Sequence, residues 1–395
     1  MRFRPIVAFL FVVSTLSAQQ TIKITVVNNA VLIPVQLNDR QLSFLLDTGS
    51  EHSVVSTAAG SVLGLDNENK VQILKNYRKQ AAGVANPASM SLGSLAFDHP
   101  SLAVVNLDSV SRALGETVDG VLGNDILQEF TFKLNYSKQL LVLGPLHRLG
   151  NLGRQVRLRR SGNDFFIPLQ LMSVPVELLV DTGTNSTNLA WGTWQRLTHA
   201  WTPPAIVDGV VRAGLPIPPA FLVCLPSVEL GADEIRDEAV RVQRPVESGA
   251  FAADSFGGIL GSDLLRSFEI TFDLKHDQLF LKKERQFQLD PYRYVTIGIQ
   301  FARNKQGTYS VMSVWKNSPA DQAGIRVGDA VSGIDGESTS EMTTEQVSSR
   351  LHGEVGTLVN LTTERNGVLS VVSLRTRQLL CGSHNPAGTL RASQN

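Results

Sequence analysis

Short apolar runs, each closed by residues that favour turns, dominate the chain up to residue 284. One of them, Phe44-Leu45-Leu46, leads directly into Asp47-Thr48-Gly49-Ser50. Another, Leu178-Leu179-Val180, leads into Asp181-Thr182-Gly183-Thr184. Three apolar residues in a row are typical of a buried strand. The residues after them turn the chain, because glycine takes unusual dihedrals and the hydroxyls bond nearby backbone. The pattern predicts two buried strands that each end in a carboxylate.

An internal repeat surrounds both segments. The sequence Ile33-Pro34-Val35-Gln36-Leu37 matches Ile167-Pro168-Leu169-Gln170-Leu171 at an offset of 134. The same offset of 134 relates Asp47 to Asp181. We therefore predict a duplication. Its alternative is two tandem structural modules that share no site.

A second motif follows each turn. Val121-Leu122-Gly123 matches Ile259-Leu260-Gly261 at an offset of 138, so the second copy has a net four extra residues before Gly231. After each motif we expect a short helical piece and a pair of strands, at 130–134 with 140–143 and at 268–274 with 278–281. Each copy then reads as about 120 residues of short strands and turns, which is typical of a small β-barrel or folded sheet.

The pattern changes after residue 291. Strands are expected at 295–301, 309–315, 331–334, 358–363 and 368–374, with turns at Asp335-Gly336 and Asn366-Gly367. Pro319 suits a first helical turn, and residues 343–346 form a capping-box pattern that opens a second helix. The resulting organisation is a first lobe at 19–145, a linker at 146–160, a second lobe at 161–284, a linker at 285–291, a third domain at 292–378 and a disordered tail at 379–395.

The N-terminus has the pattern of a secretory signal peptide over residues 1–18. Arg2 and Arg4 precede the apolar run 6–13, and small residues follow it. The run is shorter than the roughly 20 residues that span a bilayer, and we expect no integral membrane segment after cleavage. The alternative is an uncleaved anchor. We expect export, to a periplasm or to the exterior.

Composition and charge narrow the functions without naming one. The chain has 395 residues, 43% apolar and 18% charged, and its 36 Lys and Arg balance 36 Asp and Glu. Nothing in this balance indicates a nucleic-acid partner. The seven His show no ligand spacing, so we expect no metal and no other cofactor. An exported protein with Cys224 and Cys381 can form one bridge, but their settings favour two free or incidentally paired thiols.

With both Asp-Thr-Gly turns and both hydrophobic-hydrophobic-Gly motifs in place, residues 19–284 resemble the bacterial retropepsin-like aspartic proteases. The resemblance implies a mainly β fold in which two acid-protease barrels form a pepsin-like bilobal unit within one chain. We expect a monomer, because the short connector favours an intrachain partner, and lobe-to-lobe dimers between chains are the alternative. In that family the second motif cradles the catalytic loop.

The implied chemistry is general acid/base hydrolysis of a peptide bond by Asp47 and Asp181. Two carboxylates in contact share one proton, so the pair acts as base and acid at once. Thr48 and Thr182 are expected to tie the loops together, Gly49 and Gly183 to allow close approach, and Ser50 and Thr184 to bond the carboxylates. Flaps are expected within 80–88, around Gly83, and within 207–216.

Residues 292–374 resemble a PDZ domain of the bacterial protease-associated type, a β-sandwich with two helices. The resemblance rests on Ser318-Pro319-Ala320, Ala323-Gly324-Ile325, Val327-Gly328-Asp329 and Ile334-Asp335-Gly336. It implies an extended peptide or protein C-terminus as ligand. The expected peptide-binding residues are Gly298, Ile299, Gln300, Phe301, Val347 and Leu351, with Gln300 where a second glycine is common.

Two functions of different classes follow from the sequence. The first is an exported aspartic endopeptidase that acts on peptide or protein substrates and uses its PDZ domain to select them. The second is a catalytically silent peptide-binding scaffold. The intact Asp-Thr-Gly in both copies favours the first.

Overall fold

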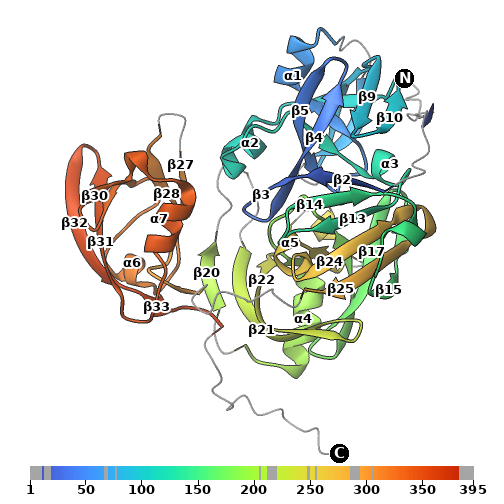
Figure 1. Ribbon diagram of the computed structural model, residues 1–395. Helices are drawn as coiled ribbons and strands as arrows, with labels where there is room; N and C mark the ends of the chain where they lie inside the picture. Colours follow the sequence, from blue (N-terminus) through green and yellow to red (C-terminus); the bar gives the residue numbers. More distant parts are fainter. Residues whose placement is uncertain are drawn as a thin grey trace, which may run out of the picture.

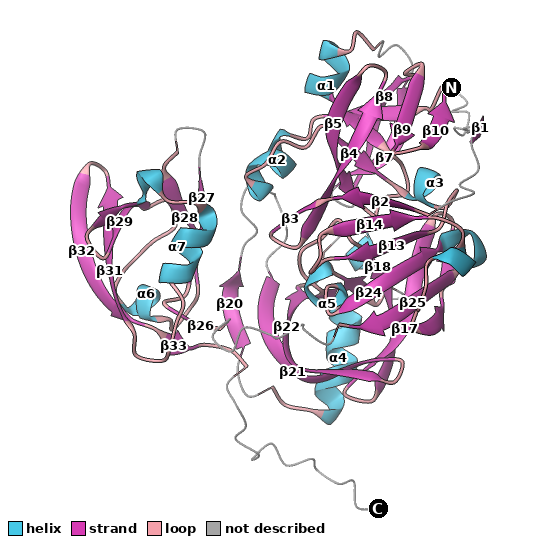
Figure 2. Ribbon diagram, viewed as in Figure 1, coloured by secondary structure: helices cyan, strands magenta, loops and turns pink. Residues whose placement is uncertain are grey.

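The structure, a computed structural model, describes residues 11–12, 19–65, 70–75, 78–203, 206–210, 220–246, 250–253, 256–284, 294–303 and 307–381. Two β lobes share a third sheet, and a smaller β domain lies beside the second lobe (Figures 1 and 2). The expectation of a mainly β chain with two lobes and a PDZ-like domain is confirmed.

Lobe 1 is built on an 11-stranded sheet. The last residues of β5 are fully buried and β12 pairs with it in parallel, so both strands end side by side at Leu46 and Leu122. Helices α1 (Thr57–Val62), α2 (Asp108–Leu114) and α3 (Asn124–Leu127) join its strands. The strand order is β1 (Phe11–Val12), β10 (Leu95–Asp98), β9 (Ser89–Leu92), β4 (Ala30–Leu37), β5 (Arg40–Leu46), β12 (Gly120–Leu122), β6 (Val54–Ser56), β11 (Leu102–Val105), β8 (Arg78–Ala85) and β7 (Lys70–Lys75), with β3 (Thr25–Val27) on β4.

Lobe 2 has an eight-stranded sheet in which the same pairing recurs. Strand β18 pairs with β23 in parallel, and both end at Val180 and Leu260. Helices α4 (Trp191–Ala200) and α5 (Ser262–Leu265) and the 3-10 turn η2 (Ala250–Ala252) complete the lobe. The strand order is β16 (Arg159–Ser161), β17 (Asp164–Leu171), β18 (Val174–Val180), β23 (Gly258–Leu260), β19 (Asn188–Leu189), β22 (Asp233–Gln243), β21 (Ala220–Leu230) and β20 (Ile206–Val210).

A six-stranded sheet joins the lobes. Its centre is the antiparallel pair β13 and β24, one from each lobe, where the rings of Phe132 and Phe272 stack with 4.6 Å between centroids. One hydrophobic core therefore runs through both lobes. The order is β15 (Arg154–Arg157), β25 (Gln278–Lys283), β24 (Phe268–Asp273), β13 (Phe132–Asn135), β14 (Leu140–Leu143) and β2 (Gln20–Lys23), with 3-10 turns η1 (Leu146–Arg148) and η3 (Leu274–His276).

Segment 146–160 is more than the linker that the sequence predicts. It contains β15, which pairs with β25, and begins β16, which pairs with β17. Arg160 forms an ion pair with Asp277 at 2.6 Å, so its charge is used in a tertiary contact. Both strands lie at sheet edges, where most side chains face water. Their sequence therefore lacks the apolar pattern of a strand.

The third domain is a five-stranded sheet with a short strand on its side. Ser318 caps the helix that starts at Pro319, and Thr343 with Gln346 forms the predicted capping box. The elements are β27 (Ile299–Arg303), β28 (Tyr309–Val314), β29 (Ala330–Ile334), β31 (Leu358–Arg365), β32 (Val368–Arg375) and β30 (Glu337–Ser338), the separate pair β26 (Val295–Thr296) and β33 (Arg377–Gln378), helices α6 (Pro319–Gln322) and α7 (Thr344–Arg350), and the 3-10 turn η4 (Thr339–Glu341).

The two cysteines are not free. Cys224 and Cys381 form a disulfide across a sequence separation of 157, so the expectation of free or incidentally paired thiols is wrong. The sequence shows no local sign of this pairing, because the fold alone brings β21 and the C-terminal segment together. Leu380, which the sequence predicts to lie in a disordered tail, is packed in the structure at 2% exposure. Residues 382–395 lie outside the described part of the chain.

Most of the predicted signal peptide, residues 1–10 and 13–18, lies outside the described residues, as does the linker 285–291. Phe11–Val12 forms β1 against β10. Among the helices that the structure describes, none has the length and apolar character needed to cross a bilayer.

Candidate active site

The two Asp-Thr-Gly loops meet between the lobes and are joined by four reciprocal hydrogen bonds. The hydroxyl of Thr48 donates to the carbonyl of Val180 (2.8 Å) and accepts from the backbone N–H of Thr182 (3.1 Å). The hydroxyl of Thr182 likewise donates to the carbonyl of Leu46 (2.7 Å) and accepts from the N–H of Thr48 (3.1 Å). Both threonines are 0% exposed, so the bonds form away from water and hold the loops in register.

Each aspartate carboxyl lies against the glycine of the other loop. A Cβ on Gly49 would come within 2.3 Å of Cγ of Asp181, and a Cβ on Gly183 within 2.2 Å of Cγ of Asp47. The N–H of Gly49 also donates to Asp47 Oδ1 (2.9 Å), and that of Gly183 donates to Asp181 Oδ1 (2.8 Å). Each carboxyl therefore lies against the glycines of both loops. A side chain at either glycine would block this arrangement.

The two residues after the glycines make different bonds. The hydroxyl of Ser50 donates its proton to the carbonyl of His52 (2.8 Å), so it does not donate to a carboxylate. Thr184 contacts Asp181 through its backbone N–H, which donates to Oδ1 (3.0 Å). The expectation for Ser50 is wrong, because its hydroxyl proton goes to a backbone carbonyl of the same turn, whereas Thr184 does bond a carboxylate.

The second motifs place their strands directly beside the loops. The backbone N–H of Asp47 donates to Leu122, and that of Asp181 donates to Leu260, each at 3.1 Å. A Cβ on Gly123 would lie 2.7 Å from the backbone of His52, and one on Gly261 would lie 2.5 Å from that of Ser186. The neighbours Val121 and Ile259 belong to the buried apolar faces of their lobes. The motif glycines thus let each strand approach its loop.

Sequence reasoning missed the residues just after these motifs. The side-chain amide of Asn124 donates to the carbonyl of Thr48 (2.7 Å) and to that of Asn163 in the other lobe (2.7 Å). The hydroxyl of Ser262 donates to the carbonyl of Thr182 (3.1 Å), so Tyr136 from lobe 1 donates to Ser262 (2.9 Å). Both supports are fully buried and sit at matching places in the repeat, which is the signal that could have revealed them.

Two more acids, both only partly exposed, bond residues that follow the loops. Asp125 accepts from the N–H (2.9 Å) and the hydroxyl (2.6 Å) of Ser53, and Asp263 accepts from the N–H (2.8 Å) and the hydroxyl (2.7 Å) of Thr187. Burial raises the pKa of both carboxyls, and the bonds from Ser53 and Thr187 oppose that rise. Through these bonds, the two acids fix the orientation of Ser53 and Thr187.

Two hydrogen bonds at the edge of the interlobe site occupy matching positions in the repeat. The residues around them differ in charge. Asn29 donates to the carbonyl of Asn185 (3.5 Å), and Asn163 donates to the carbonyl of Glu51 (3.3 Å). Beside Asn163, the pKa of Asp164 is raised to about 6 by burial and by the charges of Glu51 and Asp181. The corresponding residue in lobe 1 is the uncharged Ala30. The site is therefore more acidic at the rim formed by Glu51 and Asp164.

Replacement of Asp164 by Asn is expected to stabilise the protein at pH 7 and to have little effect near pH 4. A carboxyl whose folded pKa lies above 3.8 contributes stability below pH 4, and this contribution is lost as pH rises through about 6. Because the side chain is partly exposed, we expect a gain of about 1–2 kcal/mol at pH 7. Denaturant unfolding at pH 4 and pH 7 measures it, with the exposed Asp39→Asn as control. An equal effect at both pH values would contradict the shifted pKa.

The predicted flap segments lie on sheet-edge hairpins. In lobe 1, Gly83 pairs with Lys70 at the base of the β7–β8 hairpin, so the predicted segment is not its tip. Gly83 also pairs with Val104 of β11. In lobe 2, residues 207–210 belong to β20, and residues 211–216 lie outside the described part of the chain.

The predicted peptide-binding residues of the PDZ-like domain fall in two groups. Ile299, Gln300 and Phe301 lie on β27, an edge strand that pairs with β28. Gly298 precedes β27 with φ +85°, and a Cβ there would lie 2.2 Å from Cβ of Ser318. Val347 and Leu351, at 0% and 1% exposure, belong to the domain core.

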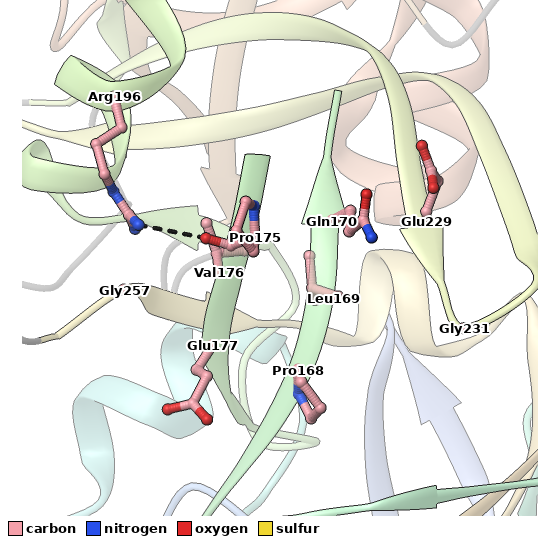
Figure 3. Close-up of a pocket in the computed structure, with 10 residues that line it drawn as sticks. All are labelled: Pro168, Leu169, Gln170, Pro175, Val176, Glu177, Arg196, Glu229, Gly231 and Gly257. Carbon is pink, nitrogen blue, oxygen red and sulfur yellow. Dashed lines mark hydrogen bonds between the residues drawn. The ribbon is translucent and has the colours of Figure 1, made fainter. Parts of the chain in front are cut away.

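A cavity of about 490 Å³ lies elsewhere on lobe 2, between β17, β18 and α4. Figure 3 shows Arg196 of α4 bonded to the carbonyl of Pro175 (3.2 Å), with Glu177 and Glu229 on the neighbouring strands. None of the predicted site residues lines this cavity. Among the described residues, no cluster of His, Cys, Asp and Glu could hold a metal ion.

Comparisons with known proteins agree with this layout. Residues 33–126 match the family described as aspartyl protease. They contain the Asp-Thr-Gly loop of lobe 1 and its Val121-Leu122-Gly123 motif. Residues 310–365 match the PDZ domain family. The chain is also similar to a probable CtpA-like serine protease of Staphylococcus saprophyticus, at 26% identity over 149 residues. That match covers 37% of this chain and 30% of the relative, so the chain spans less than a third of the relative's length. The chain thus carries a retropepsin-like aspartyl protease domain followed by a PDZ domain.

Proposed function

We propose that this protein is an aspartic endopeptidase that hydrolyses peptide bonds with Asp47, Asp181 and a water molecule. The observation that carries the proposal is the pair of loops joined by Thr48 and Thr182, with each carboxyl against the other loop's glycine. One chain supplies both loops, so a monomer suffices for the chemistry.

The reaction needs one proton shared by the two carboxyls. The ionised carboxylate takes a proton from a water that attacks the scissile carbonyl carbon, while the protonated carboxyl donates to the carbonyl oxygen. The aspartate that took the proton from water then donates it to the amide nitrogen, the other aspartate takes a proton back from a hydroxyl of the diol, and the carbon–nitrogen bond breaks to give an acid and an amine. The pair titrates as a unit, so neither aspartate is assigned the acid role.

The surrounding residues keep this geometry fixed. Thr48 and Thr182 set the spacing of the loops, and Asn124 and Ser262 hold the loop carbonyls from the other side. Such support matters because small displacements of reacting groups cost large factors in rate.

The PDZ domain adds a second binding function to the proposal. Strand β27 ends its sheet, and edge strands of this kind accept an extended peptide by strand addition. We propose that it binds extended segments or C-termini of protein substrates. Export to a periplasm or to the exterior is proposed with it. The N-terminal signal pattern supports export, and so does the Cys224–Cys381 disulfide, a bond that persists in oxidising compartments.

Hydrolysis of an unfolded protein by the full chain tests the proposal. We expect cleavage within roughly pH 3–7, the range in which a pair of carboxyls shares one proton. We also expect inhibition by a peptide whose scissile carbonyl is replaced by a hydroxyl-bearing carbon, which resembles the tetrahedral intermediate. If no cleavage occurs across this range while the PDZ domain binds peptide, the chain is a silent scaffold.

A further inference from the structure

The sheet of lobe 2 ends at β20, and this edge strand lies against the PDZ domain. Strand β20 pairs with β21 on one side and contacts β28 of the PDZ domain on the other. Figures 1 and 2 show β20 between β22 and the PDZ domain. In lobe 1 the corresponding edge strand β7 pairs with β8 alone among the described strands. The two lobes therefore differ in what covers their edges, and proteins commonly cover an edge strand because its unpaired backbone groups can pair with another chain.

The contact between lobe 2 and the PDZ domain has a small apolar centre. Val207 of β20 and Cys224 of β21 are buried together with Trp315, which follows β28, and Leu380. Tyr294 adds polar contacts, because its hydroxyl accepts from the N–H of Ala239 in β22 (3.0 Å). The same Tyr294 hydroxyl lies 3.4 Å from Glu238 Oε2.

The C-terminal segment closes this contact. The N–H of Leu379 donates to the carbonyl of Tyr294 (3.0 Å), and Cys381 is bonded to Cys224 of β21. Both ends of the PDZ domain, at Tyr294 and at Cys381, are thereby held at one place on lobe 2. Interfaces between domains of one chain permit relative motion unless they are large and apolar, and this apolar centre has few residues. A covalent bond at this point restricts that motion.

The disulfide and strand β20 are connected to the candidate active site through the sheet of lobe 2. Strand β21 pairs with β22, and Cys224 lies opposite Ala239. The N–H of Arg241 in β22 donates to the carbonyl of Thr187 (2.9 Å). Thr187 in turn bonds Asp263 and the N–H of Gly261 beside the second loop.

We propose that the Cys224–Cys381 disulfide is a thiol-sensitive lock that fixes the PDZ domain on the edge of the lobe 2 sheet. A dithiol reductant transfers two electrons and two protons to the bridge, yielding two cysteine thiols and the oxidised dithiol. The lock then opens, and β20 loses its cover. This role does not depend on the proposed hydrolysis, because it concerns the placement of the PDZ domain.

Hydrogen exchange on the full-length oxidised chain, with and without dithiothreitol, tests the lock. We expect the amides of β20 and of the β26–β33 pair to exchange about tenfold faster after reduction. Strands β7 and β8, together with the shared pair β13 and β24, should be unchanged and serve as internal controls. Small-angle X-ray scattering should show a broader set of dimensions in the reduced protein.

Cys381→Ser separates the lock from general stability, because this residue packs against the small cluster between lobe 2 and the PDZ domain and is not part of the main core of the lobes. The variant should reproduce the fast exchange of β20 and should no longer respond to dithiothreitol. Unchanged exchange of β20 in the variant and in the reduced wild type would overturn the proposal. Equal loss of protection in every strand would also overturn it, since the bridge would then support the whole fold. Neither result would bear on the proposed peptide hydrolysis, which the cleavage assay tests independently.

Discussion

If the proposed mechanism holds, Asp47→Asn and Asp181→Asn are each expected to lower the rate of peptide hydrolysis by about 1,000-fold or more. General acid/base groups supply roughly 10²–10⁴-fold in rate, and an amide can neither take the proton from water nor return it to the leaving nitrogen. The loss should appear mainly in kcat, because the asparagine keeps the size of the side chain and leaves substrate contacts in place. Initial rates on an unfolded protein substrate over pH 3–7 give the comparison.

The matched control is Asp39→Asn, which makes the same chemical change at an exposed turn far along β4 from the loops. It should keep the wild-type rate. Thermal unfolding of all three variants should show that they are folded. Cleavage that survives either loop substitution would remove the aspartic mechanism, whatever the PDZ domain binds.

Gly183→Ala is expected to reduce the rate of peptide hydrolysis by about 100-fold or more, although it adds only one methyl group. Its Cβ would lie 2.2 Å from Cγ of Asp47 and 2.5 Å from both carboxyl oxygens, so the carboxyl or the loop must move. Displacement of a reacting group by about 1 Å costs on the order of 10² in rate. Gly49→Ala should act in the same way through Asp181, at 2.3 Å. Overpacking at these sites should also cost about 1–3 kcal/mol of unfolding free energy.

Gly60→Ala provides the contrast. Gly60 lies in α1, and a Cβ there would meet nothing nearer than Val104 at 3.9 Å. Because alanine is a better helix former than glycine, this change should leave activity intact and stabilise the protein by about 0.5–1 kcal/mol. Wild-type rates in Gly183→Ala, measured beside this control, would mean that the carboxyl of Asp47 is not held against the glycine during catalysis.

The local signals in the sequence proved informative where a few neighbouring residues decide the structure. The apolar runs before Asp47 and Asp181 indicated buried strands that end in a carboxylate, and β5 and β18 end there. The capping box at Thr343 and the turn at Asn366-Gly367 likewise appear where the sequence placed them. Such features depend on backbone propensities and short-range hydrogen bonds, which a single segment carries by itself.

The repeat also indicated which segments belong together, but not how they are supported. Ser50 was expected to bond a carboxylate and instead bonds His52, while Asn124 and Ser262 hold the loops from positions that composition does not single out. The choice among several acceptors within reach depends on side-chain directions that the packed lobes set. Segment 146–160 shows the same limit, because its strand β15 finds its partner more than a hundred residues away in β25.

The sequence alone determined the fold class, the two Asp-Thr-Gly turns and the order of the lobes and the PDZ domain, since each rests on patterns within short stretches. The tertiary structure decided the remaining features, which join distant residues. These are the threonine bonds across 132 to 136 residues, the raised pKa of Asp164 beside Glu51 of the other lobe, and the Cys224–Cys381 bridge across 157 residues. Their common cause is that the energy of each contact depends on which groups the finished fold brings together and shields from water.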